Sequence, residues 1–114
     1  MTASMERTWT AVCSTLAVPE YAGVAALLDG GVQVAIFHLP GGHWYALSNW
    51  DPCSGAAVLS RGIVGDAGGI PVVASPVYKE RFDLRSGECL DAEGVSVPVY
   101  RVRVEEGSVE VESV

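Results

Sequence analysis

Closely spaced turn residues limit what this chain can fold into. Glycine stands beside acidic residues, proline or a second glycine at Asp29-Gly30-Gly31, Pro40-Gly41-Gly42, Asp66-Ala67-Gly68-Gly69 and Glu106-Gly107. Glycine supplies the positive φ that tight hairpin turns need. Short apolar or alternating runs separate these turns, and no long helical pattern is present. The sequence therefore predicts an all-β fold, an antiparallel β-sandwich of several short strands with little helix.

Apolar and alternating runs place the expected strands. Three consecutive strands should form a meander, while the stretch Ser14–Ala22 should be a loop with at most one helical turn and Ser48–Gly62 a long loop. Long ordered loops are often functional. The expected strands are Thr8–Cys13, Gly23–Leu28, Val32–His38, His43–Leu47, Ile70–Ala74, an alternating run over Val95–Glu105, and a last strand through Val109 and Val111.

Length and charge narrow the functional classes. The 114 residues are expected to form one domain, 1–114, with residues 1–7 disordered. A net charge of −7 at pH 7 argues against nucleic acid as a partner, because such binding needs clustered Lys and Arg. Anionic membranes are disfavoured for the same reason, and no apolar run is long enough to span a bilayer. Because no signal peptide is recognised, a cytoplasmic location is expected.

The cysteines and histidines support neither a disulfide framework nor an enzyme site. Cys13, Cys53 and Cys89 are odd in number and widely spaced, so they are expected to remain reduced and to bind no metal. His38 and His43 both fall in the predicted meander, away from any paired nucleophile. No phosphate loop or dinucleotide fingerprint is present. We therefore expect no catalytic residue, no metal site and no cofactor in this chain.

The stretch Val73–Cys89 carries the most specific pattern. It combines a strand, a proline turn with its tip at Ser75–Lys79, a return strand, and a second turn closed by Gly87. Its continuation Arg81-Phe82-Asp83-Leu84-Arg85-Ser86-Gly87 resembles the second ligand loop of Rieske iron–sulfur domains. Those domains hold a two-iron cluster with two cysteines and two histidines.

The resemblance to Rieske domains ends at the ligand positions. The first ligand pair is best matched by Asn49 and Asp51, and the second by Ser75 and Tyr78. None of the four is a thiolate or an imidazole, so no cluster is expected to bind. We also expect the Tyr78 hydroxyl to hydrogen-bond to Asn49 or Asp51 and so close the emptied site.

A narrower family shares both the scaffold and the missing ligands. The strings Ser48-Asn49-Trp50-Asp51-Pro52, Val58-Leu59-Ser60-Arg61-Gly62 and Ala74-Ser75-Pro76 resemble the small subunits of assimilatory NAD(P)H-dependent nitrite reductases. This resemblance implies an accessory role in nitrate assimilation and, as a partner, the large catalytic subunit that reduces nitrite to ammonium. FAD, siroheme and an iron–sulfur cluster are then expected in the large subunit.

Alternative functions and a docking surface follow from the same residues. A Rieske-type two-iron, two-sulfur electron carrier is the main alternative, and a ligand-binding module that reuses the emptied site is a third. Exposed loop aromatics and local cations are typical of interfaces, although Trp50 could instead cover the core. The candidate partner interface comprises Trp50, Asp51, Lys79, Arg81 and Arg85.

Overall fold

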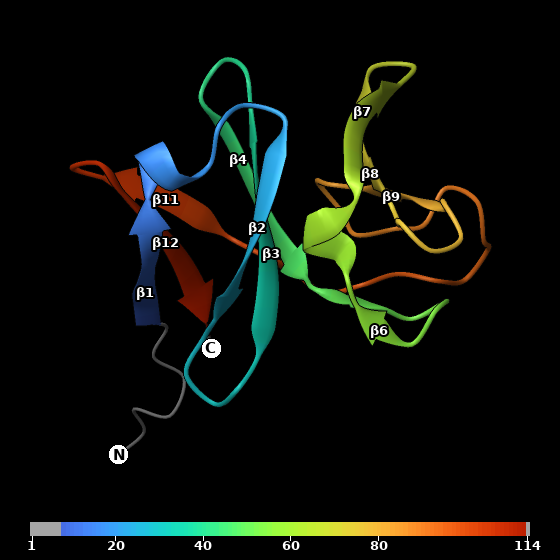
Figure 1. The fold of residues 1–114 in the computed structure, drawn as a ribbon, viewed down its shortest axis with the longest axis horizontal. Helices are drawn as coiled ribbons and strands as arrows, with labels where there is room; N and C mark the ends of the chain where they lie inside the picture. Colours follow the sequence, from blue (N-terminus) through green and yellow to red (C-terminus); the bar gives the residue numbers. More distant parts are fainter. Residues whose placement is uncertain (1–7, 114) are drawn as a thin grey trace.

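The structure, a computed structural model, describes residues 8–113, so the expected disordered start at residues 1–7 lies outside it. Antiparallel strands form three layers, with the meander in the middle (Figure 1). The all-β prediction is confirmed. The strands are β1 (Thr8–Ser14), β2 (Ala22–Leu27), β3 (Gln33–Leu39), β4 (His43–Ser48), β5 (Trp50–Asp51), β6 (Ala56–Ala57), β7 (Ile63–Ala67), β8 (Ile70–Ala74), β9 (Arg81–Asp83), β10 (Val99–Tyr100), β11 (Val102–Glu105) and β12 (Ser108–Ser113).

The predicted meander is the central sheet, ordered β10-β4-β3-β2. Strand β3 is buried on both faces, which explains its continuous apolar run. Val34 and Ile36 point into one core cluster, whereas Ala35 and Phe37 point into the other. The central sheet therefore separates two hydrophobic clusters.

The outer sheet, ordered β1-β12-β11, covers one face of the central sheet. Val109 and Val111 on β12 pack with Val34, Ile36 and Ala46. The stretch expected to be a loop with at most one helical turn contains one, the 3₁₀ turn η2 (Thr15–Ala17). This layer contains both ends of the described chain.

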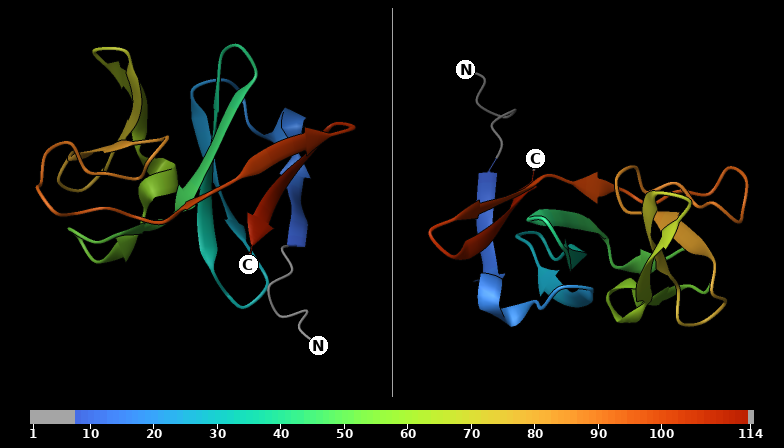
Figure 2. Two further views of the ribbon diagram at one scale, coloured as in Figure 1. Left: turned by 180° about the vertical axis from the view of Figure 1, so that it is seen from behind. Right: turned by 90° about the horizontal axis from the view of Figure 1, so that it is seen from above.

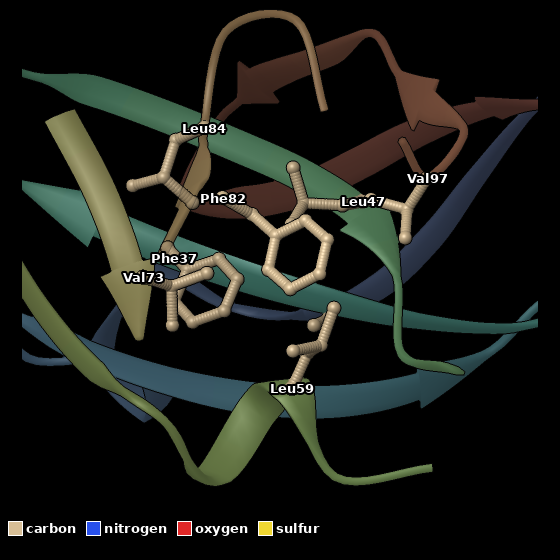
Figure 3. Packing of buried hydrophobic residues seen from close by; sticks show 8 residues of the cluster. Phe37, Leu47, Leu59, Val73, Phe82, Leu84 and Val97 are labelled. Atoms are coloured by element: carbon tan, nitrogen blue, oxygen red, sulfur yellow. The ribbon is translucent and has the colours of Figure 1, made fainter. Parts of the chain in front are cut away.

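A loop-rich layer covers the other face. It contains the sheet β7-β8-β9, the two-stranded β5-β6 ribbon and the 3₁₀ turn η3 (Leu59–Arg61). The long loop expected over Ser48–Gly62 thus holds short ordered elements, and the sequence pattern did not predict β7. Figure 3 shows the hydrophobic cluster under this layer. The residues labelled there are Phe37, Leu47, Leu59, Val73, Phe82, Leu84 and Val97.

The expected continuous strand over Val95–Glu105 is wrong. The chain breaks at Arg101, because β10 pairs with β4 in the central sheet and β11 pairs with β12 in the outer sheet. Seen from behind, this segment runs from the loop layer across to the outer sheet (Figure 2). An alternating pattern continues through such a sheet change, so it cannot reveal the break.

Within residues 8–113, no helix is long and apolar enough to cross a membrane.

Candidate functional site

Two loops of the loop-rich layer meet at a buried hydrogen bond. The first loop comprises residues 49–62 and the second loop residues 75–80. The Ser75 hydroxyl donates to Asp51 Oδ2 over 2.5 Å. Asp51 is 0% exposed and Ser75 is 1% exposed. Ser75 stands at the cysteine position of the second Rieske ligand pair, and Asp51 stands at the histidine position of the first pair. A polar contact therefore joins these two positions.

The Asp51 carboxylate is surrounded by donors. Oδ2 also accepts from the Ser54 hydroxyl at 2.8 Å, and Oδ1 accepts from the Cys53 amide at 2.9 Å. Burial alone would raise the pKa of Asp51, but the hydrogen bonds from Ser75, Ser54 and the backbone outweigh it and hold the pKa below its ordinary value. Asp51 is therefore the charged centre of the loop junction.

Asn49 is buried but does not face Ser75. Its amide nitrogen donates to Gln33 Oε1 and to the Ala57 carbonyl, both at 3.2 Å, and its side-chain oxygen accepts from the Ser60 amide at 2.7 Å. These bonds tie the first loop to strand β3 and to η3. Of the two positions matched to ligands in the first loop, only Asp51 thus contributes to the junction.

The expected hydrogen bond from Tyr78 to Asn49 or Asp51 is wrong. The Tyr78 side chain is 66% exposed, and within the described chain Asp51 accepts from Ser75, Ser54 and the Cys53 amide rather than from Tyr78. The tip places Tyr78 outside because Lys79 adopts a left-handed conformation (φ 66°) and its amide donates back to the Ser75 carbonyl at 3.0 Å. Serine closes the site in place of tyrosine.

Cys53 and Glu80 join Asp51 at the same junction, although the sequence predicted no role for either residue there. One ligand-type atom from each of the three residues lies within 4.8 Å of the other two. Glu80 is 9% exposed, and its Oε1 accepts no hydrogen bond from any residue of the described chain. Partial desolvation raises the pKa of the Cys53 thiol, and the carboxylates of Glu80 and Asp51 raise it further. The sequence indicates this cluster only through Asp51-Pro52-Cys53, where two potential metal ligands lie two positions apart in a turn.

The candidate interface residues are mostly exposed. Trp50 is 52% exposed and borders a shallow pocket with Val32 and Ala57, so it does not cover the core. Lys79 is exposed at the tip of the second loop. Asp51 lies too deep to contact a partner directly.

Ion pairs reduce the positive charge expected on this surface. Arg81 binds Asp91 through two side-chain bonds of 2.7 and 2.9 Å, which lowers the pKa of Asp91 to about 2. Arg85 binds Asp83 through two bonds of 3.1 Å. Lys79 takes part in no salt bridge with the residues described. The positive patch is therefore centred on Lys79.

The donor set at the junction does not fit a Rieske cluster. Such a cluster needs two thiolates and two imidazoles, whereas the junction offers two carboxylates, two hydroxyls and one thiol. Both histidines lie on the meander, and His38 is held there by a 2.8 Å hydrogen bond to the Val18 carbonyl and by stacking on Trp44.

Comparison with known proteins relates this scaffold to one family. The Rieske-like [2Fe-2S] domain family matches residues 8–112. A nitrite reductase (NADH) small subunit from Salmonella typhimurium is 41% identical over 90% of this chain and 95% of its own length. The crystal structure of a proposed NADH-dependent nitrite reductase small subunit from Mycobacterium tuberculosis is 50% identical, with a TM-score of 0.92 over 96% of this chain and 97% of that one.

A further match lies inside a much larger protein. The nitrite reductase [NAD(P)H] large subunit of Klebsiella oxytoca is 48% identical to this chain over 103 residues, which is 90% of this chain and 11% of the relative. The chain thus spans about a tenth of that relative.

Proposed function

The chain belongs to the family of NADH-dependent nitrite reductase small subunits within the Rieske-like [2Fe-2S] domain family, and from this premise we propose that it is the accessory small subunit of a cytoplasmic NAD(P)H-dependent nitrite reductase. In this role it docks onto the large catalytic subunit, which carries FAD, siroheme and an iron–sulfur cluster and reduces nitrite to ammonium in nitrate assimilation. In this proposal the large subunit supplies the catalytic residues.

The observation that carries this proposal is the 41% identity over nearly the whole length of a small subunit. The Klebsiella oxytoca relative adds support, because there a similar sequence forms part of a large subunit. A domain that occurs both as a separate chain and inside its partner's chain is expected to work in contact with that partner. We therefore place its function in the complex.

The proposal includes operation without an iron–sulfur cluster. The loop junction has one thiol and no imidazole among its described donors, whereas the electron-carrier alternative requires both ligand types at the cluster. Protein produced with iron and sulfide supplied should be colourless and free of stoichiometric iron. Visible absorption with two irons per chain would favour the electron carrier instead.

The two loops offer the docking surface that the structure supports best. Trp50, Val77 and Tyr78 are 52%, 46% and 66% exposed, and the exposed Lys79 directly follows Tyr78 in sequence. Exposed aromatics contribute strongly when an interface buries them. Arg81 and Arg85 border this surface with their charges already paired. We assign the partner contact to this end of the molecule.

Copurification with the large subunit of the same enzyme tests the docking surface. Trp50→Ala and Tyr78→Ala should each weaken the complex by about tenfold or more, as expected for interface anchors. Leu16→Ala is the matched control, because Leu16 is 91% exposed on η2 in the outer layer. Equal binding by all four proteins would reject this surface.

Activity measurements test the accessory role itself. NADH oxidation driven by nitrite should be higher, or longer-lived, when the large subunit is produced together with this chain. A large subunit that is fully active and stable alone, and that does not bind the chain, would refute the proposed function.

A further inference from the structure

The loop junction contains a ligand set that the sequence did not predict. Asp51 and Cys53 come from the first loop and Glu80 from the end of the second loop. Their ligand atoms lie within 4.8 Å of one another, although Asp51 and Glu80 are 29 positions apart in the chain. We propose that Asp51, Cys53 and Glu80 form a mononuclear zinc site. This inference does not rest on the proposed function.

Glu80 is the observation that distinguishes this junction from an ordinary acidic cluster. Its side chain is about nine-tenths buried, and although the Cys53 thiol hydrogen-bonds to this carboxylate, Oε1 itself has no donor among the residues the structure describes. An unsatisfied buried carboxylate is costly unless it is paired or coordinates a metal. The oxygen lies beside a second carboxylate and a thiol, so a cation between them would satisfy it.

Asp51 retains the capacity to bind a metal. Metal-ligating carboxylates commonly accept hydrogen bonds as well, and Oδ1 of Asp51 accepts one from the Cys53 amide at 2.9 Å. The bonds to Ser75 and Ser54 are made by Oδ2. These contacts, together with a backbone hydrogen bond from Ser54, orient the carboxylate.

The ligand types select zinc over the common hard cations. Thiolate ligands favour zinc, whereas magnesium and calcium prefer oxygen-only sets. Ligand atoms around tetrahedral zinc lie roughly 3.5 Å apart, so the three side chains need to close only slightly from their present separation. Cys53 is exposed and can make that adjustment. Three protein ligands leave the fourth position of the zinc to water.

Binding is expected to release one proton. The Cys53 thiol loses its proton to solvent as its sulfur bonds to zinc, so the site changes from two negative charges to three as the zinc adds two positive charges. Zinc therefore offsets the repulsion between the carboxylates of Asp51 and Glu80. Affinity should rise with pH, because less work is then needed to remove the thiol proton.

A competition titration with a chromophoric zinc chelator tests the site on the reduced full-length chain. One zinc should bind per chain, and Glu80→Gln or Cys53→Ser should weaken binding by about tenfold or more. Glu88→Gln and Cys13→Ser are matched controls, since both residues lie outside the junction. Wild-type affinity equal to that of the Cys53→Ser, Glu80→Gln double variant overturns the proposal.

Two further measurements keep the test independent of folding defects. Cobalt in place of zinc should give thiolate-to-metal charge-transfer absorption that disappears in Cys53→Ser, and its absence from the wild-type protein overturns the proposed ligation. In metal-free buffer, Glu80→Gln should unfold at the wild-type temperature or higher, because it removes a buried carboxylate that lies beside the carboxylate of Asp51. Zinc should then raise the unfolding temperature of the wild type but not of this variant.

Discussion

At the scale of single residues, one serine and one aspartate hold the two loops together. Ser75 and Asp51 are fully buried, and their hydrogen bond joins positions 24 residues apart. The same serine hydroxyl accepts from the Val77 amide at 3.2 Å, so it also shapes the tip of the second loop. The emptied Rieske-like site is thus closed by an ordinary hydrogen-bond network.

Removing the Ser75 hydroxyl should destabilise the fold. Ser75→Ala leaves the buried Asp51 carboxylate without one of its donors, which should lower the free energy of unfolding by about 1–3 kcal/mol. Ser86→Ala is the control, because the Ser86 hydroxyl accepts an exposed 3.2 Å bond from the Glu88 amide and is not part of the buried junction. Chemical denaturation measures both, and equal stability of the two variants would contradict this role of Ser75.

The charge of Asp51 should make stability depend on pH in the acid range. Because folding lowers the pKa of Asp51 below its ordinary 3.8, its ionised form stabilises the protein above pH 3.8. That contribution is lost as the pH falls through the lower folded value. The stability difference between wild type and Asp51→Asn should therefore shrink below pH 3.8, and a difference that stays constant down to pH 2 would count against it. Denaturant titrations at several pH values provide the measurement.

At the scale of elements, Gly87 shows how hydrogen bonds hold a turn against the segment that contains Val97. The turn after β9 closes with the Gly87 amide donating to the Asp83 carbonyl at 2.8 Å, and the Gly87 carbonyl accepts from the Val97 amide at 2.9 Å. Gly87 has φ 83°, and a Cβ there would overlap the Val97 carbonyl oxygen. This turn therefore tolerates no side chain.

Two glycine variants separate the effect of backbone conformation from that of space. Gly87→Ala should cost about 3 kcal/mol or more, because it adds a steric overlap to an unfavourable φ. Gly94→Ala should cost about 1 kcal/mol, since Gly94 has φ 78° but its Cβ would meet nothing within 4 Å. Thermal or chemical unfolding compares the stability of the two variants. Equal losses of stability would show that the steric overlap at Gly87 is unimportant.

At the scale of the whole molecule, two hydrophobic clusters share one sheet. Phe37 on β3 and Leu47 on β4 belong to the cluster under the loop-rich layer. Their chain neighbours Ile36 and Ala46 belong to the cluster under the outer sheet. Neither cluster can form without these strands. The loop junction is consequently supported by the same strands that hold the outer sheet.

This sharing predicts that the described chain unfolds as a single domain. Phe82→Ala in one cluster and Val109→Ala in the other should both shift one common transition, with losses of about 3–5 kcal/mol for the phenylalanine and less for the valine. Far-ultraviolet circular dichroism and tryptophan fluorescence should report the same midpoint. Separate midpoints for the two probes would indicate that the layers unfold independently.

Local chemistry made most of the strands predictable. Positive φ at Gly30, Gly41 and Gly68 confirms the hairpin turns expected from the glycine pairs. The meander and the Ser75–Lys79 tip follow because turn residues and alternation act over a few positions. The break at Arg101 could not be predicted, since alternation is unchanged when a chain passes from one sheet to another.

The sequence by itself determined the strands, the turns and the loss of the four cluster ligands, because each of these depends on residue identity and on neighbours a few positions away. Only the tertiary structure decided which side chains meet between the loops. It joined Ser75 to Asp51, turned Tyr78 outward, and brought Glu80 to Cys53. These contacts depend on how two loops pack over a shared core, and residue spacing along the chain does not specify that packing.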